Sequence, residues 1–429
     1  MRDWSSVSRP YPKPWSGLVV ICGPKPWASG ELFVVSTYLY MSGQRSHFTE
    51  MASKDIDPFA ILGFLVTSMK KDRSKTDLFQ PVVPVHKAHK DFVKLMESAD
   101  HTAAKQMMND VYGRLGDPNG NFIRNFQGEA FHSRLFELAC GAYLEAAGHH
   151  LDRTHETPDF IAISKDQRVA IEVTTTNPPT RNSTDISAQN IEKLPMAAIM
   201  DKCQNEFAIR MGNILVTKRR KRYWSLPQCR GLPVVIIVGP FHEAGAAFYA
   251  DESLARYLYG VDVFPDWVER NGLLVRAAPV MNHEYAGHSV ASNFFEQRQS
   301  ENISAVIYAN AFTESRFFRL TLGKDAENWF QVRRGGFALV PRTPSDYALA
   351  DFDYDITDPQ APEETWWQGV TVFFNPHARV PLPEDFLPHT SCFRVLGGLP
   401  IREVWDFHPL TSWMIVCRKS SSGAHLPGL

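Results

Sequence analysis

The sequence predicts an α/β protein in which a mixed β-sheet is flanked by helices, followed by a β-rich C-terminal region. Between residues 127 and 260, apolar side chains follow helical and strand periods in the order helix, two strands, helix, strand, helix. Residues 233–238 form a continuous apolar run rich in β-branched side chains, which is typical of a strand buried on both faces. Beyond residue 270, short strand-like runs alternate with loops rich in Pro, Asp and Gly.

The composition is that of a globular protein. The 429 residues are 44% hydrophobic and 21% charged, which suits a chain that buries a core and forms two or three folded units. The formal net charge is only −2, so any affinity for nucleic acid must come from a local basic patch. No apolar run approaches the ~18–20 residues that span a bilayer, and the six cysteines show no CxxC spacing. We therefore expect a cytoplasmic protein with free thiols and no membrane contact.

The N-terminal part divides into two segments. Residues 1–50 are rich in proline, contain three tryptophans and show little periodicity. Two interpretations stay open for this segment: an irregular, β-rich or extended arm, or a non-native stretch with translation beginning at Met51. Residues 51–126 are expected to form a helical lead-in, with helices over residues 89–98 and 102–114.

The predicted core covers residues 127–262. Apolar residues recur at helical spacing over residues 131–146, and Gly148 supplies a stop signal. Strands are predicted over residues 158–163 and 168–176, since both are short runs rich in β-branched residues and bounded by turn residues.

A second helical layer follows in the same core. One apolar stripe over residues 196–214 predicts a long helix, and residues 253–259 predict a short one after the buried strand. Residues 263–429 are expected to form the β-rich C-terminal region. The predicted strands of this region cover residues 273–277, 303–308, 316–322, 370–374 and 413–417.

Two acidic residues stand at unusual places in the predicted strands. In the strand over residues 168–176, Glu172 and Thr174 point to the same face, because side chains alternate along a strand. A carboxylate in mid-strand is rarely buried unless it pairs or binds a metal. Asp159 opens the neighbouring strand directly after Pro158, so the two carboxylates converge if the strands pair. Hard oxygen ligands of this kind suit Mg²⁺.

These residues resemble the pattern of the PD-(D/E)XK nuclease superfamily, which has the restriction-endonuclease-like fold. The pattern is a helix that bears a Glu, then Pro-Asp on one strand, then (Asp/Glu)-x-Lys on the next. Glu137, Pro158, Asp159 and Glu172 match it in order and spacing within residues 127–260. The resemblance implies that Asp159 and Glu172 hold Mg²⁺ or Mn²⁺, that Glu137 assists, and that the protein cuts DNA.

The chain departs from the pattern at Thr174, which stands where the family has its lysine. That lysine helps to orient or deprotonate the attacking water and stabilises developing negative charge. In some family members the lysine has moved to a nearby helix. Lys218 is the best replacement, because it continues the stripe of Met211 and Ile214, and Lys202 is the second choice. If neither reaches the site, the core binds DNA without cutting it.

A basic run follows the long helix. The predicted nucleic-acid contacts are Arg219, Arg220, Lys221, Arg222, Tyr223 and Trp224. Basic residues beside aromatic ones suit phosphate contacts combined with base stacking. The alternative is a solvated helix end, where cations are favoured by the helix dipole.

The sequence thus predicts a metal-dependent DNA endonuclease, with a role in bacterial defence or repair. One alternative is a catalytically inactive nucleic-acid-binding module, and another is an interaction scaffold whose C-terminal region binds a protein partner or a second copy. Residues 131–376 are also similar to a bacterial family of no settled function. A zinc-protease motif at His283 and His288 is disfavoured, because the two histidines are five positions apart and not four.

Overall fold

The computed structural model describes six stretches of the chain: residues 77–177, 196–243, 245–268, 272–322, 330–343 and 346–418. The arm expected over residues 1–50 and the first part of the helical lead-in lie outside the described residues. None of the helices in these stretches is long and apolar enough to cross a membrane.

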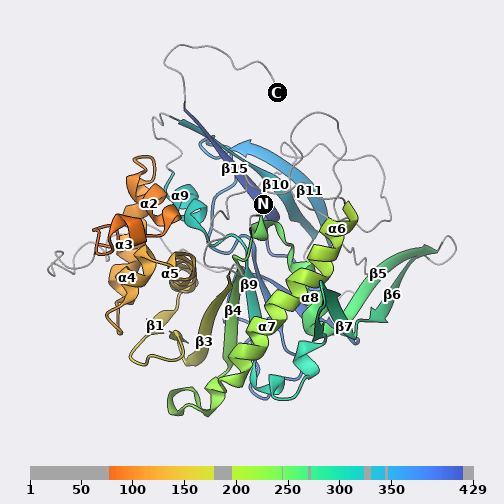
Figure 1. Cartoon of the computed structure of the whole chain (residues 1–429). Coiled ribbons are helices and arrows are strands. Elements are labelled where there is room, and N and C mark those ends of the chain that lie inside the picture. Colours follow the sequence, from red (N-terminus) through yellow and green to blue (C-terminus); the bar gives the residue numbers. More distant parts are fainter. Residues whose placement is uncertain are drawn as a thin grey trace, which may run out of the picture.

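An N-terminal helical layer packs against the first helix of the core. It consists of α2 (Lys90–Glu97), α3 (Thr102–Leu115) and α4 (Phe122–Gln127), which lie beside α5 (Phe131–Ala146) in Figure 1. The rings of Phe92, Phe126 and Phe131 contact one another with centroids 5.3–6.3 Å apart and join the layer to the core. The helices predicted over residues 89–98, 102–114 and 131–146 are confirmed.

The centre of the molecule is an eight-stranded mixed sheet. Its order is β1-β2-β3-β4-β9-β12-β13-β14. The strands are β1 (His150–Asp152), β2 (Phe160–Ser164), β3 (Gln167–Thr176), β4 (Val234–Pro240), β9 (Ala305–Ala309), β12 (Val370–Phe374), β13 (Ser391–Leu396) and β14 (Leu399–Glu403). β4 runs parallel to β3 and β9, and β12 runs parallel to β13, whereas the other neighbours are antiparallel.

Strand β4 shows how the sheet separates two apolar cores. Val235 and Ile237 pack into the core that contains α5, whereas Ile236 and Val238 pack into a second core. Every residue of β4 is buried, so the prediction of a strand buried on both faces is confirmed.

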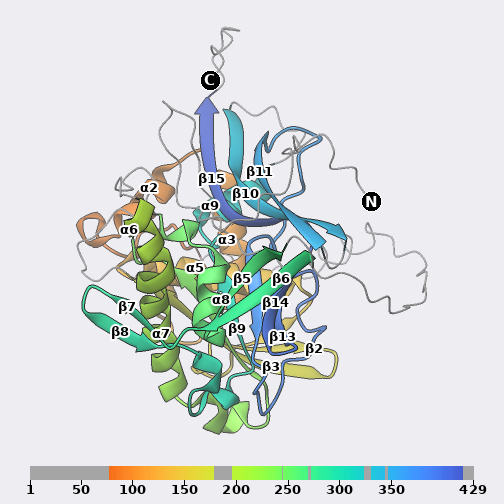
Figure 2. The ribbon, with the colours of Figure 1, turned by 90° about the vertical axis from the view of Figure 1, so that its right-hand side faces the viewer.

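The second core is covered by helices from the middle of the chain. These are α7 (Phe207–Arg220) and α8 (Asp251–Tyr259), and a π-helical segment (Lys202–Glu206) joins α7 to the preceding α6 (Met196–Asp201). The views in Figures 1 and 2 show α7 running along the sheet. The predicted long helix is confirmed and extends to Arg220.

The C-terminal part adds smaller sheets. A three-stranded antiparallel sheet has the order β11-β10-β15, and two hairpins pair β5 with β6 and β7 with β8. Figure 2 shows the three-stranded sheet above the central sheet. The strands are β5 (Val261–Val268), β6 (Gly272–Pro279), β7 (Asn282–Tyr285), β8 (His288–Ala291), β10 (Phe330–Thr343), β11 (Asp346–Asp355) and β15 (His408–Arg418).

One predicted strand of this region is wrong. Residues 316–321 belong to helix α9 (Glu314–Thr321), and Leu322 is its C-cap. Arg316 donates to the carbonyl oxygens of Thr365 and Gln368, and Arg319 pairs with Glu364. Side chains three apart share one side of a helix but not one face of a strand, so only the helix lets both arginines reach this segment.

The central sheet also crosses the boundary expected at residue 262. Strands β9, β12, β13 and β14 come from the C-terminal part and extend the sheet beyond β4. The described chain is therefore a mixed α/β structure with a large sheet flanked by helices, in which the C-terminal part completes the sheet and adds further β-structure.

Candidate active site

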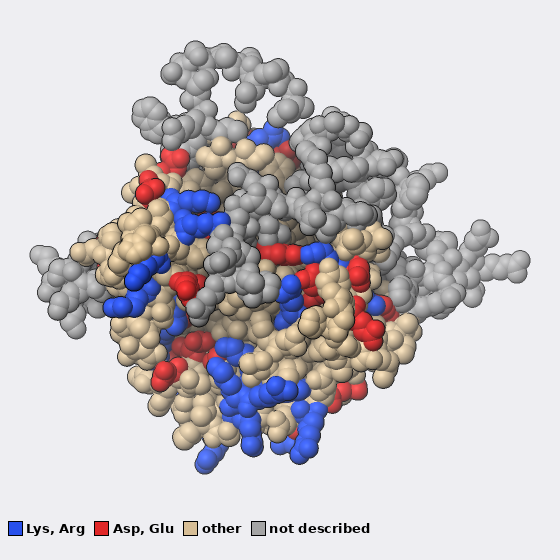
Figure 3. Space-filling view, viewed as in Figure 1, with Lys and Arg blue, Asp and Glu red and all other residues tan. Residues whose placement is uncertain are grey.

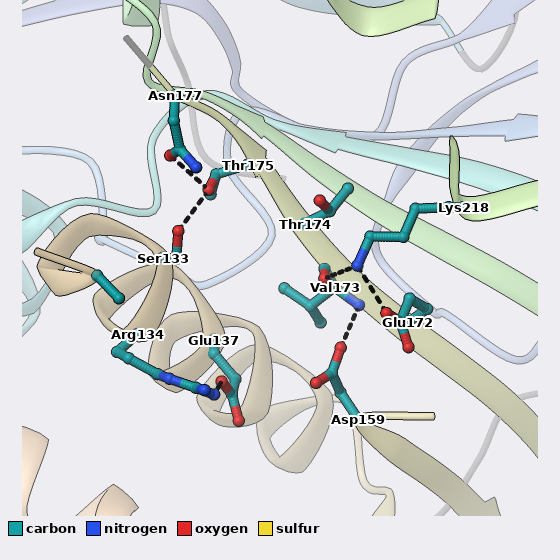
Figure 4. Close-up of a pocket in the computed structure, with 11 residues that line it drawn as sticks. Ser133, Arg134, Glu137, Asp159, Glu172, Val173, Thr174, Thr175, Asn177 and Lys218 are labelled. Carbon is teal, nitrogen blue, oxygen red and sulfur yellow. Dashed lines mark hydrogen bonds and ion pairs between the residues drawn. The ribbon is translucent and has the colours of Figure 1, made fainter. Parts of the chain in front are cut away.

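A pocket of about 250 Å³ opens between α5, β3 and α7. Its lining includes all five residues that the sequence predicts as a catalytic group: Glu137, Asp159, Glu172, Thr174 and Lys218. In Figure 4, Glu137 comes from helix α5 on one side of the pocket and Lys218 from helix α7 on the other. Glu172 and Thr174 come from β3, and Asp159 directly precedes β2.

The pairing of β2 with β3 brings the two predicted metal ligands together. Phe160 pairs with Ile171, so the antiparallel register carried one residue further sets Asp159 opposite Glu172. The Val173 backbone N–H donates to Asp159 Oδ2 over 2.7 Å and fixes the carboxylate at the strand end. Glu172 itself is buried, with 5% of its surface exposed.

Asp159 carries the electrostatic signature of a crowded acidic site. Burial raises its pKa to about 7, and the nearby Glu172 and Glu137 carboxylates raise it in the same direction. The Val173 N–H acts the other way but does not offset these effects. The Asp159 carboxyl therefore takes up a proton more readily than an ordinary aspartate, because it is buried beside two other acids.

Glu137 is held by two arginines that the sequence analysis did not single out. Its Oε2 accepts from Arg134 Nη1, one turn earlier on α5, and its Oε1 lies 2.5 Å from Arg153 Nη2. The guanidinium of Arg153 also lies over the Phe160 ring, 5.1 Å from its centroid. The three-residue spacing of Arg134 and Glu137 on one helix was a usable signal, but nothing in the sequence pointed to Arg153.

Lys218 brings to the pocket the positive charge that Thr174 lacks. Its Nζ donates to Glu172 Oε1 over 2.6 Å and to the Val173 carbonyl oxygen over 3.3 Å. Lys202, the second choice for this role, pairs instead with Glu206 and Glu243. The pocket lysine is therefore Lys218.

Three polar residues line another part of the pocket. Ser133 Oγ and Thr175 Oγ1 lie 2.8 Å apart, and the Thr175 hydroxyl also contacts Asn177 Oδ1 at 3.1 Å. These small polar groups form no recognisable motif, so only the fold shows that they share the pocket with the acids.

Some cations of the basic run are exposed to solvent, whereas Arg219 is held by contacts with other side chains. Arg220, Lys221 and Arg222 are exposed, and Figure 3 shows Lys and Arg side chains gathering at the lower end of this face, where α7 ends. Lys221 Nζ lies 3.9 Å from Glu172 Oε1, so this patch adjoins the pocket. Arg219 is different, because it donates to the side chains of Gln297 and Ser300 and lies over the Phe294 ring.

The base-stacking role expected of Tyr223 is wrong, whereas that of Trp224 stays a prediction. Tyr223 is 1% exposed and packs in a small core with Ile161 and Val234. Trp224 is half-buried and packs against two of the apolar cores. Because Tyr223 is buried in this core, its ring does not offer an open face to bases.

The donors in the pocket fit a hard divalent cation. Asp159 and Glu172 both supply carboxylate oxygens to the pocket, and Mg²⁺ and Mn²⁺ prefer such oxygen ligands. A cation bound there would offset the repulsion among the acids, which is one of the causes of the raised pKa of Asp159.

Comparison with known proteins finds no relative of this chain. No family model matches the chain, and neither a curated protein nor a solved structure matches it. The resemblance to the PD-(D/E)XK pattern therefore depends on the residues and geometry of the pocket alone.

Proposed function

We propose that the protein is a divalent-metal-dependent nuclease with a PD-(D/E)XK-like core, and that DNA is its substrate. The observation that carries the proposal is the contact of Lys218 with Glu172, beside Asp159, in one pocket. Two acids on adjacent strands and a lysine are the groups that the family pattern requires. Here the lysine comes from α7 and not from β3.

The acids and the lysine have different roles in this proposal. Asp159 and Glu172 would hold Mg²⁺ or Mn²⁺, which supplies Lewis acidity toward the phosphate and toward a water molecule. The Lys218 ammonium is fixed by Glu172 and by the Val173 carbonyl, so it can stabilise the negative charge that develops on the phosphate during attack.

The exposed end of α7 would bind the nucleic-acid backbone. Arg220, Lys221 and Arg222 follow Lys218 directly, and Lys221 approaches Glu172 from the solvent side. Phosphates on either side of the scissile bond would meet these cations, which supply affinity without sequence preference.

A second candidate is a binding module that has lost catalysis. Both oxygens of Glu137 pair with arginines, and Oε1 of Glu172 pairs with Lys218. In this candidate, these ion pairs take the place of a metal, and Arg220, Lys221 and Arg222 still bind nucleic acid.

A cleavage assay distinguishes the two candidates. Purified protein is incubated with supercoiled plasmid, single-stranded DNA or RNA in Mg²⁺, Mn²⁺ or EDTA. We expect metal-dependent cleavage that Glu172→Gln abolishes while binding persists. Glu206→Gln is the matched control, because Glu206 is also a buried acid in an ion pair but lies outside the pocket lining.

The other outcomes are equally informative. Binding without cleavage in any metal would favour the binding module. If the protein neither cuts nor binds any of these substrates, both candidates fail and an interaction scaffold is left.

A further inference from the structure

Two histidines and one aspartate converge outside the candidate active site, where α2 meets α5. His89 precedes α2 as its N-cap, Asp91 lies in the first turn of α2, and His132 is in the first turn of α5. One nitrogen from each imidazole and one oxygen from the carboxylate all lie within 4.8 Å of one another.

The separations within this cluster resemble those of ligands around a tetrahedral ion. Asp91 Oδ2 lies 3.2 Å from His132 Nε2 and 3.8 Å from His89 Nδ1, whereas Oδ1 faces Lys94. Zinc with ligands at ~2.0–2.1 Å in a tetrahedron separates neighbouring ligand atoms by about 3.3 Å. Small side-chain shifts would therefore bring all three atoms to a common ion.

The two imidazole rings are held in place by aromatic neighbours. His89 stacks on Phe131 with centroids 5.4 Å apart, and His132 stacks on Phe241 at 5.5 Å. Both ring nitrogens of His132 are buried, and neither has a hydrogen-bond partner of good geometry among the described residues. Buried polar atoms without such a partner are uncommon, and an absent ion is one reason for them.

Metal binding requires a neutral imidazole and an ionised carboxylate, so protons would compete with the ion at this site. The Asp91 amide donates to His89 Nδ1, so an ion bound there would replace this hydrogen bond.

We propose that His89, Asp91 and His132 form a zinc site that ties the N-terminal helical layer to the core. Two imidazoles and one carboxylate favour Zn²⁺ over Mg²⁺, and a fourth position would hold water or another exchangeable ligand. The site would be independent of the oxygen-rich pocket, but it would brace one wall of it, because His132 adjoins the pocket residue Ser133.

Metal titration of the whole chain tests the site. The protein is stripped with a chelator and titrated with ZnCl₂ or CoCl₂. We expect one tight equivalent in addition to any weaker binding in the oxygen-rich pocket, a visible Co²⁺ absorption typical of four-coordinate sites, and a rise in Tm with Zn²⁺. His132→Gln and Asp91→Asn should each remove the absorption and the rise in Tm.

Two control variants separate this site from other metal binding. His150→Gln changes an exposed histidine outside the cluster, and Glu172→Gln changes the active-site pocket. Both should keep the Co²⁺ absorption and the rise in Tm, whatever they do to cleavage. If the parent protein shows no such signals, or if they survive in Asp91→Asn, the zinc site is overturned. Should His132→Gln fail to fold, the Asp91→Asn result decides.

Discussion

The Nζ atom of Lys218 lies 2.6 Å from Oε1 of Glu172, although 46 positions separate the two residues in the chain. Helix α7 runs along the sheet and delivers the lysine to the middle of β3. The charge that Thr174 cannot provide on the strand is therefore supplied from a neighbouring element. Four experiments follow from this arrangement and from the rest of the fold.

The first prediction concerns the rate of cleavage. Lys218→Met should lower the single-turnover rate by about 10²–10³-fold, the usual cost of losing one donor to developing charge. Lys202→Met is the control, because Lys202 pairs with Glu206 and Glu243 and should leave the rate nearly unchanged. Equal losses in both variants would show that the effect comes from folding and not from the pocket.

The second prediction concerns the stability of the ion pair. Urea unfolding in the absence of metal would compare Glu172→Gln, Lys218→Met and the double variant. Both side chains are largely buried, so we expect a favourable coupling of about 0.5–3 kcal/mol in the free energy of unfolding. A coupling near zero would mean that the contact between Lys218 and Glu172 contributes nothing measurable to the free energy of unfolding.

The third prediction concerns the salt dependence of binding. Reversing Arg220, Lys221 and Arg222 to Glu should weaken binding to duplex DNA and reduce the log–log salt slope by about 0.9 for each lost phosphate contact. Arg124→Glu on α4 changes another exposed arginine and should leave the slope unchanged. An unaltered slope in the triple variant would mean that the end of α7 is only solvated. Arg219 is omitted, because its side chain contacts Gln297 and Ser300.

The fourth prediction concerns a buried acid in the C-terminal part. Glu364 pairs with Arg334 at 2.5 Å and with Arg319 at 3.0 Å. Although burial acts in the opposite direction, these arginines lower the pKa of Glu364 to about 2. Glu364→Gln should therefore reduce the free energy of unfolding at pH 7 by about 3–5 kcal/mol, because it leaves buried arginines uncompensated.

The pH dependence of this difference has a definite sign. Glu364 has an ordinary pKa of 4.5, and its folded pKa is depressed. Its contribution is therefore present above pH 4.5 and is lost as the pH falls toward 2, so the difference between parent and variant should narrow below pH 4.5. Glu363→Gln, an exposed neighbour, should show no such difference. A difference that stayed constant down to low pH would contradict the assigned cause.

Several helices and strands were predicted correctly because their apolar periodicity is visible within a short stretch of sequence. The continuous apolar run of β4, the alternation along β3 and the stripe of α7 each follow from periods that a short window shows. The position of Lys218 was predictable for the same reason, because it continues the stripe of α7. The local pattern predicts a strand where helix α9 lies, because the buried arginines of this helix are explained only by partners in the distant segment around Glu364.

Contacts between distant segments could not be predicted from such patterns. Arg153 reaches Glu137 from a loop after β1, and His132 meets Asp91 across two helices. Neither pair has a spacing that marks it in the sequence. Tyr223 is a further example of a contact that local sequence does not reveal. Its place beside the basic run suggested stacking on nucleic-acid bases, whereas the fold buries its ring under the end of the helix.

The strand order of the central sheet has a consequence for synthesis on the ribosome. Strands β1 to β4, which carry Asp159 and Glu172, are made before β9, β12, β13 and β14. Until those later strands emerge, the nascent sheet ends at β4, whose residues are all buried in the finished protein. Such an apolar open edge is a template for wrong pairing, so we expect the emerging chain to need a chaperone at this stage.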